Sequence, residues 1–329
     1  PTPAAIPVLN IHILLFHTPH PQAEQRFGAI RPLFRFSGIF LRLPPNVSRE
    51  TFTLEKTTKN GKMPFILPPV VLYFYYYRFG VEFCMGKTIA IINQKGGVGK
   101  TTTAVNLSAA VGAAGKKVLI CDIDPQGNTT SGYGVNKRSV QNSAYDVLIN
   151  GVPTAQAILH TKFKNVDILP SDINLAGAEV EMIALEKRES LLKNALASVW
   201  EQYDYIFLDC PPSLGLITIN ALCASVSFLV PIQCEYYALE GLAQLMTTVR
   251  QIKRLYNPHI ELEGVLLTMY DGRLNLTNQV VEEVKKFFPK KVYKSTIPRN
   301  VRLSEAPSFG EPVLYYDKNS KGAAAYTAF

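Results

Sequence analysis

The residues best suited to chemistry form a glycine-rich stretch at 94–102, which reads QKGGVGKTT. Glycines allow consecutive backbone N–H groups to turn towards an anion without clashes from Cβ atoms. Lys100 would supply positive charge to the β- and γ-phosphates of a nucleotide, and the Thr101 hydroxyl would be a ligand of Mg²⁺. The usual pattern GxxxxGK[ST] is not met, because Gln94 occupies the first glycine position. A glycine-rich turn with solvated lysines is the alternative, but it does not account for this combination of residues between a strand and a helix.

Two carboxylate motifs follow, each at the end of an apolar run typical of a buried strand. Asp122-Ile-Asp124-Pro-Gln126 comes after KVLIC, and Asp209-Cys-Pro-Pro-Ser213 comes after YIFL. A carboxylate at the end of such a strand lies beside a phosphate loop, where it can orient Mg²⁺ or water. An isolated Asp there is usually a turn or cap residue, but two in order after a phosphate loop favour a functional role. For Asp122 the alternative of mainly shaping the loop stays open.

Strands alternate with helices from residue 85 onwards. Short β-branched or apolar runs predict strands at 88–93, 117–122, 166–169, 205–209, 227–232 and 264–268. Apolar and small-residue patterns predict helices at 101–114, 175–200 (with an interruption allowed for), 239–255 and 276–288. This alternation predicts an α/β fold of the P-loop NTPase class, with a mostly parallel twisted sheet and helices on both faces.

Composition divides the 329 residues into two unlike parts. The net charge of the chain is +8, but residues 1–84 hold 9 Lys and Arg against 4 Glu and no Asp, which leaves +3 for residues 85–329. The basic excess is therefore no sign of nucleic-acid binding by the second part. The five cysteines include no CxxC pair, which excludes a disulfide scaffold and gives no sign of zinc or an iron–sulfur cluster. A reducing, cytoplasmic compartment fits this cysteine usage.

Residues 1–84 have no sustained apolar period and hold 11 of the 22 prolines. Their most apolar run, residues 65–77, is shorter than the roughly 20 residues that a membrane span needs. A signal peptide would need a basic start, and residues 1–10 carry no charge. We therefore expect Met85 to be the natural start, residues 1–84 to be a non-native upstream or disordered segment, and residues 85–329 to be one P-loop ATPase domain.

The phosphate loop resembles that of a known superfamily. KGGVGKTT is similar to the deviant Walker A loop of the ParA/MinD superfamily of P-loop ATPases. The resemblance implies that Lys95 reaches across a nucleotide-sandwich dimer to the partner's phosphates. It also implies that Asp124 is the switch carboxylate needed for hydrolysis, and that Asp209 is the Walker B acid, which acts on Mg²⁺ commonly through water.

Further blocks resemble the ParA/Soj chromosome-partitioning ATPases. These blocks are MGKTIAIINQKGGVGKTTTAVNLSAA, DIDPQGNTTSGYG, LDCPPSLGLITINAL, GVLLTMYDGRLNL and IPRNVRLSEAPSFGEPV. The family ends with one further helix, so we expect the C-terminus to be clipped. The resemblance implies a Mg²⁺-dependent ATPase that forms a homodimer with ATP and binds double-stranded DNA without sequence preference. A ParB-type centromere-binding protein would stimulate hydrolysis and release the dimer, so the protein would be cytoplasmic and nucleoid-associated, with no membrane partner.

The resemblance also assigns individual residues. The expected catalytic residues are Lys95, Lys100, Asp124 and Asp209, and the expected Mg²⁺ ligands are Thr101, Asp124 and Asp209. The expected ATP-binding residues are Lys95, Gly96, Gly97, Val98, Gly99, Lys100, Thr101, Thr102, Pro298 and Asn300. Arg273 and Arg302 match positions of DNA contacts, for which charge and reach suffice, although Arg302 could instead form an ion pair with Glu305. Lysines that could widen this surface, or simply be solvated, are Lys285, Lys286, Lys290, Lys291 and Lys294.

Three other interpretations stay open. A MinD-like, membrane-associated division-site ATPase would rely on a C-terminal basic amphipathic helix, which the sequence does not show. A nitrogenase-type iron protein would need paired cluster cysteines at a dimer face, which the cysteine positions do not obviously provide. A scaffold that binds nucleotide without turnover would not need Asp124. The DIDPQGN block and the two arginines favour partitioning.

Overall fold

The computed structural model describes residues 34–36, 39–41, 54–58, 61–65, 86–235 and 238–329. The chain divides into two compact units, residues 1–83 and 84–329. In the first unit the described residues form two antiparallel pairs, β1 (Phe34–Phe36) with β2 (Ile39–Leu41) and β3 (Leu54–Thr58) with β4 (Gly61–Phe65). The expectation that residues 1–84 are non-native or disordered falls mostly outside the described residues and stays a prediction.

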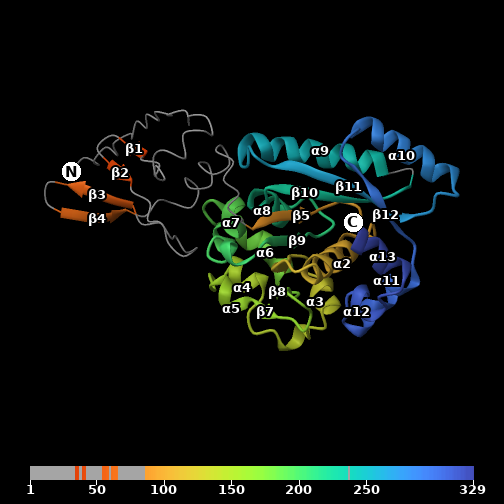
Figure 1. Ribbon diagram of the computed structural model, residues 1–329, viewed down its shortest axis with the longest axis horizontal. Helices are drawn as coiled ribbons and strands as arrows, with labels where there is room; N and C mark the ends of the chain where they lie inside the picture. The colour runs from red at the N-terminus through yellow and green to blue at the C-terminus, as the bar shows by residue number, and fades with distance from the viewer. Residues whose placement is uncertain (1–33, 37–38, 42–53, 59–60, 66–85, 236–237) are drawn as a thin grey trace, which may run out of the picture. The chain divides into compact units, whose positions relative to one another are not determined.

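The second unit is built on one eight-stranded sheet (Figure 1). Its strands lie in the order β12-β11-β10-β5-β9-β6-β8-β7. Their bounds are β5 (Lys87–Ile91), β6 (Val118–Asp122), β7 (Leu159–His160), β8 (Val166–Leu169), β9 (Tyr205–Asp209), β10 (Ser227–Gln233), β11 (Glu261–Tyr270) and β12 (Val292–Pro298). The pairs are parallel except that β7 is antiparallel to β8. This sheet confirms the predicted α/β class.

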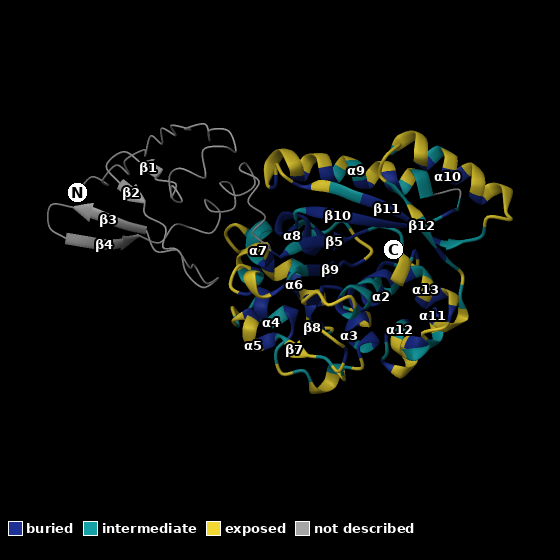
Figure 2. Ribbon diagram, in the orientation of Figure 1, coloured by how far each residue is buried: buried dark blue, intermediate teal, exposed yellow. Residues whose placement is uncertain are grey.

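Alternate side chains of the central strands enter two separate cores, one on each face of the sheet. In β5, Ile89 and Ile91 belong to one core and Ala90 to the other, and in β6 Leu119 and Cys121 join Ala90. This follows from the two-residue repeat of a strand, and burial on both faces explains why these strands are almost wholly apolar. Figure 2 shows the central strands as buried over most of their length.

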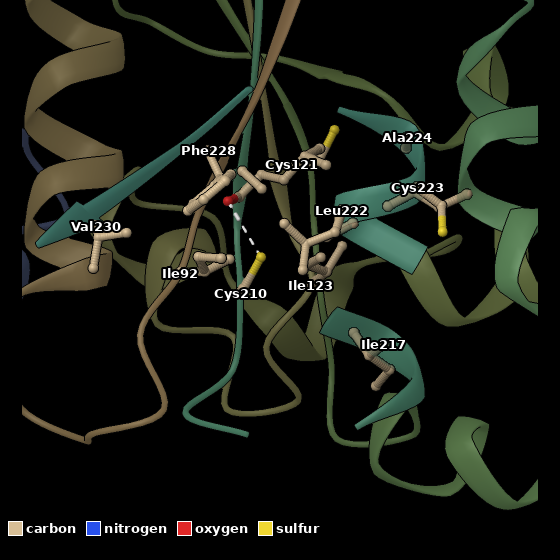
Figure 3. Packing of buried hydrophobic residues seen from close by; sticks show 14 of the residues in the cluster. Ile92, Cys121, Ile123, Cys210, Ile217, Leu222, Cys223, Ala224, Phe228 and Val230 are labelled. Atoms are coloured by element: carbon tan, nitrogen blue, oxygen red, sulfur yellow. Dashed lines mark hydrogen bonds between the residues drawn. The ribbon is translucent and has the colours of Figure 1, made fainter. Parts of the chain in front are cut away.

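Helices cover both faces of the sheet. One core receives side chains from α2 (Lys100–Ala113), α11 (Val301–Glu305), α12 (Val313–Tyr316) and α13 (Lys321–Ala328). The other receives them from α4 (Ala144–Leu148), α5 (Thr154–Ala157), α6 (Leu175–Met182), α7 (Leu191–Leu196), α8 (Leu216–Ala224), α9 (Ala238–Leu255) and α10 (Asn275–Phe287). Figure 3 shows this second core, where Cys121 and Cys210 are buried among side chains of α8 and β10. Among the described residues, no helix is both long and apolar enough to cross a membrane.

The sequence prediction allowed for an interruption in one helix and did not include strand β12, and both features have local causes. The helix predicted over 175–200 is interrupted between α6 and α7, where Lys187 takes a left-handed φ of 52° that no helix continues through. Strand β12 was not predicted, because it mixes polar and apolar residues and buries only Ile297.

One contact brings distant segments together without side chains between them. Gly134, just after α3 (Asn128–Gly132), packs against Gly310, which ends the short 3₁₀ helix η5 (Ala306–Phe309). A Cβ on Gly310 would lie 2.5 Å from the Cα of Gly134, so only glycine permits this approach.

Candidate nucleotide-binding site

The glycine-rich stretch forms a loop between β5 and α2, as predicted. Gly97 and Gly99 have φ values of 73° and 88°, which are left-handed conformations that favour glycine. Gly99 occupies the N-cap of α2, so the first backbone N–H groups of this helix face the loop. The hydroxyl of Thr268, near the carboxyl end of β11, donates to the carbonyl of Val98 at 2.7 Å and braces the loop. Loop and helix start therefore form a rigid anion cradle.

Lys100 lies within this cradle. Its side chain is buried, with 6% of the residue exposed, and its Nζ donates to the carbonyl oxygen of Lys95 at 3.1 Å. Burial lowers the pKa of Lys100, while the carboxylate of Asp209 opposes that shift. A desolvated ammonium in this position is prepared to bind a phosphate chain.

Lys95 lies at the rim of the loop and contacts its own chain. Its Nζ approaches Glu235 Oε2, just after β10, at 2.5 Å, and its backbone N–H donates to Asn93 Oδ1 at 3.0 Å. Beside it, Gln94 Nε2 donates to Gln244 Oε1 of α9 at 2.7 Å. These residues border an open cleft whose lining includes Gln94, Lys95, Pro212, Ser213, Gly241 and Gln244. In this structure Lys95 is thus held by Glu235.

The predicted carboxylates gather at the carboxyl ends of β6 and β9. Asp122 and Asp209 are direct partners in the register of these parallel strands, and both are fully buried. Asp124 follows two residues after Asp122, is 7% exposed, and accepts the backbone N–H of Gln126 at 2.9 Å. Asp122 accepts three hydrogen bonds, from Thr130 N and Oγ1 at 2.7 Å each and from Asp124 N at 3.3 Å. Asp122 therefore shapes the loop that carries Asp124.

Only one of the two carboxylate oxygens of Asp209 accepts a hydrogen bond from the described residues. Its Oδ2 accepts a hydrogen bond from the hydroxyl of Thr129 at 2.7 Å. Its Oδ1 is buried and has no hydrogen-bond partner among the described residues. An unpaired buried carboxylate oxygen is costly, and with the Thr101 hydroxyl it supplies the oxygen donors that Mg²⁺ prefers. These residues fit a Mg²⁺ ion that takes its other ligands from phosphates and water.

Electrostatics at the strand ends also favour a cation. Burial raises the pKa of Asp209 to about 6, against the nearby hydroxyls of Thr129 and, to a smaller extent, Thr101, which lower it. Burial, followed by the neighbouring charge of Asp209, raises the pKa of Asp122 to about 7. Two buried carboxylates side by side resist being charged together, and a bound cation would relieve that repulsion.

Both arginines assigned to DNA contact are engaged in ion pairs. Arg273, between β11 and α10, donates to both carboxylate oxygens of Asp271, from Nε at 2.8 Å and Nη2 at 2.6 Å. Arg302 on α11 contacts Glu305 at 2.8 Å and Asp317 at 3.2 Å. The Glu305 ion pair, left open by the sequence, is therefore present. The Arg273 side chain is nevertheless 87% exposed, so its remaining surface is accessible to an anion.

Pro298 and Asn300 lie at the same end of the sheet as the phosphate loop. Pro298 ends β12 and pairs with Tyr270, two residues after Thr268, which braces the phosphate loop. Asn300 uses its side-chain oxygen to accept the backbone N–H of Arg302 at 3.1 Å and so caps α11. Lys285 and Lys286 pair with glutamates three residues earlier, as solvated helix lysines do.

Three contributing residues were not predicted: Glu235, Thr129 and Thr268. Glu235 lies two residues after the carboxyl end of β10, and Thr268 lies two residues before that of β11. The strand-end rule that selected Asp124 and Asp209 would have found them. Thr129 lies in the DIDPQGNTT block, but its contact with Asp209 joins residues 80 apart in sequence, which no local pattern reveals.

Comparisons with known proteins agree with this geometry. A family model described as an AAA domain matches residues 86–262. The chain is 58% identical over 242 residues to the sporulation initiation inhibitor protein Soj of Bacillus subtilis, covering 74% of this chain and 96% of that protein. It is 49% identical over 244 residues to the chromosome partitioning protein ParA of Myxococcus xanthus, covering 74% and 86%. A solved cobyrinic acid a,c-diamide synthase from Mycobacterium smegmatis, with bound ATP analogue and magnesium, matches with a TM-score of 0.67 and 36% identity over 74% of this chain and 92% of that one. Since the sequence matches are this extensive and the fold carries the phosphate loop with its strand-end carboxylates, the chain belongs to the ParA/Soj family of P-loop ATPases.

Proposed function

We propose that this protein hydrolyses ATP with Mg²⁺ and uses the nucleotide state to bind and release DNA during DNA segregation. One observation carries the proposal. Lys100 is buried in the phosphate loop, next to Asp209, whose Oδ1 pairs with none of the described residues. A buried ammonium in a backbone anion cradle fits a phosphate chain, and the spare oxygen fits the accompanying cation.

Positioning and charge stabilisation would come from residues of the chain itself. The backbone N–H groups of 96–102 would orient the phosphates, and Lys100 would bind the β- and γ-phosphates. Thr101, and Asp209 directly or through water, would hold Mg²⁺, which when bound neutralises charge on the phosphates. Asp124, on the loop beside Asp209, would orient a water molecule for in-line attack. Catalysis of this kind needs no covalent nucleophile.

Lys95 would complete the site in a homodimer. To reach the partner's phosphates, its ammonium must leave Glu235. The ATP-bound dimer would present Arg273 and Arg302 twice, and paired positive surfaces suit the backbone of double-stranded DNA without sequence preference. A ParB-type centromere-binding protein would stimulate hydrolysis and release the dimer. On this proposal the protein acts in the cytoplasm, on the nucleoid.

Two narrower assignments belong to the same proposal. Pro298 and Asn300 would border the adenine base, since Pro298 ends β12 and Asn300 comes two residues later, at the end of the sheet that holds the phosphate loop. Residues 85–329 would be the ATPase domain, and residues 1–84 an upstream segment without a part in it. Limited proteolysis tests the boundary, because a protected, cooperatively folded segment 1–84 would contradict it.

Phosphate release by the full chain tests the activity. With Mg²⁺ and ATP, we expect slow turnover that rises when nonspecific duplex DNA and a cognate ParB-type protein are both present. Lys100→Ala is the control, since it removes the buried ammonium and with it ATP binding. A wild-type chain that binds ATP but releases no phosphate under these conditions would refute hydrolysis and favour a nucleotide-binding scaffold.

A further inference from the structure

Two consecutive threonines on α3 bind the two strand-end carboxylates separately. Thr129 Oγ1 donates to Asp209 Oδ2, and Thr130 Oγ1 donates to Asp122 Oδ2, each at 2.7 Å. All four residues are fully buried. Because Asp122 and Asp209 are direct neighbours in the sheet, the two hydrogen bonds fix α3 across the ends of β6 and β9.

The carboxylates of Asp122 and Asp209 differ in whether both oxygens accept hydrogen bonds from the described residues. Asp122 uses both oxygens, since Oδ2 accepts two hydrogen bonds from Thr130 and Oδ1 accepts the backbone N–H of Asp124. Asp209 uses only Oδ2, and its buried Oδ1 lacks a partner among the described residues. The carboxylate of Asp209 is therefore held from one side, with the other oxygen left to a ligand.

We propose that Thr129 is a positioning residue for the magnesium site, because its hydroxyl fixes the Asp209 carboxylate with Oδ1 turned to the cation. The inference rests on the proposed role of Asp209 in binding Mg²⁺. Rotation about the Cβ–Cγ bond of aspartate has a broad, two-fold energy profile, so an unheld carboxylate would not keep one oxygen in place. Partners of metal-binding groups commonly supply this kind of restraint.

The Thr129 hydroxyl also connects Asp209 to the segment that carries Asp124. Thr129 lies five residues after Asp124, on the short α3 that follows the loop carrying Asp124. Its hydrogen bond to Asp209 therefore ties the segment that orients water to the residue that holds the cation. Thr130 makes a chemically similar bond to Asp122, which uses both of its oxygens within the fold and so leaves none for a cation. Thr130 is thus a matched control.

The test measures how much Mg²⁺ the full chain needs to bind a fluorescent ADP analogue. Thr129→Val removes the hydroxyl and keeps the side-chain shape, whereas Thr129→Ser keeps the hydroxyl. We expect Thr129→Val to raise the half-saturating Mg²⁺ concentration about 10- to 100-fold, with unchanged nucleotide binding in EDTA. Thr129→Ser should restore the wild-type requirement, and Thr130→Val should lower the thermal midpoint while leaving the Mg²⁺ requirement near wild type.

Several results would overturn the inference. A folded Thr129→Val chain with the wild-type Mg²⁺ requirement would exclude the positioning role. Equal increases in Thr129→Val and Thr130→Val would show general loosening of α3 instead. If Thr129→Val does not fold, Thr129→Ala is judged by the same criterion. A wild-type chain whose nucleotide binding ignores Mg²⁺ would instead refute the proposed magnesium site itself.

Discussion

The ion pair between Lys95 and Glu235 leads to a prediction about dimerisation. The Nζ–Oε2 distance is 2.5 Å, and the side chains are 36% and 44% exposed. Glu235 competes with a partner's phosphate for the Lys95 ammonium, and its own negative charge would repel that phosphate, so the ion pair opposes the proposed sandwich dimer. We therefore expect Glu235→Gln, which keeps the shape and removes the charge, to strengthen ATP-dependent dimerisation.

The size of the effect follows from the exposure of the pair. Partly exposed ion pairs contribute about 0.2–1 kcal/mol. Each dimer opens two of them, one per protomer, which amounts to roughly 0.4–2 kcal/mol. The dimer dissociation constant should therefore fall about 2- to 30-fold. The gain should shrink as salt rises, because exposed charges are screened.

Sedimentation velocity with a non-hydrolysable ATP analogue, over a series of protein concentrations, measures this constant. Glu263→Gln is the matched control, because Glu263 contacts Lys87 at 2.8 Å at the opposite end of the sheet. This control should leave dimerisation unchanged. A weaker dimer in Glu235→Gln, or an equal gain in both variants, would refute the competition between Glu235 and the phosphates.

Three further predictions concern catalysis, DNA and pH. Asp124→Ala leaves the phosphate loop intact, so we expect near-normal ATP binding with hydrolysis reduced about 100-fold or more and the dimer retained on DNA; rapid phosphate release would count against this assignment. Arg273→Glu reverses an exposed charge, so fluorescence anisotropy at low salt should show at least about 10-fold weaker DNA binding with unchanged ATP affinity, and unaltered DNA affinity would exclude the residue. The pKa of Asp122 is raised to about 7 in the folded protein. Between about pH 4 and pH 7 the folded state therefore keeps a proton that the unfolded chain has lost. As a result, the contribution of Asp122 to the free energy of unfolding falls as pH rises through this range. Asp122→Asn should remove that loss. Its free energy of unfolding relative to wild type, measured in urea without nucleotide, should rise by about 1.4 kcal/mol per pH unit over this range; a difference that falls as pH rises would contradict the burial argument.

The sequence predicted the parts of the site that depend on local pattern. Left-handed positions such as Gly97 and Gly99 need glycine, and short apolar runs that end in Asp122 and Asp209 are typical of buried parallel strands. Hence the phosphate loop and the strand-end carboxylates were predicted together with the fold class.

What the sequence could not predict depends on distant partners. Glu235 meets Lys95 across 140 residues, and Arg302 meets Asp317 only because α11 and the segment after α12 come together in the fold. The interruption at Lys187 also escaped a precise prediction, since a lysine in the left-handed region gives no compositional signal.

The contact between Gly134 and Gly310 joins the segment after α3, next to the strand-end carboxylates, to the segment that follows Arg302. Two bare backbones meet there, so no rotatable side chain can absorb a displacement of one segment relative to the other. α3, which Thr129 and Thr130 attach to the strand-end carboxylates, therefore meets η5, which continues directly from α11, through backbone atoms alone. A rearrangement at the phosphates that pushed α3 towards η5 would thus be transmitted directly to the segment that carries Arg302.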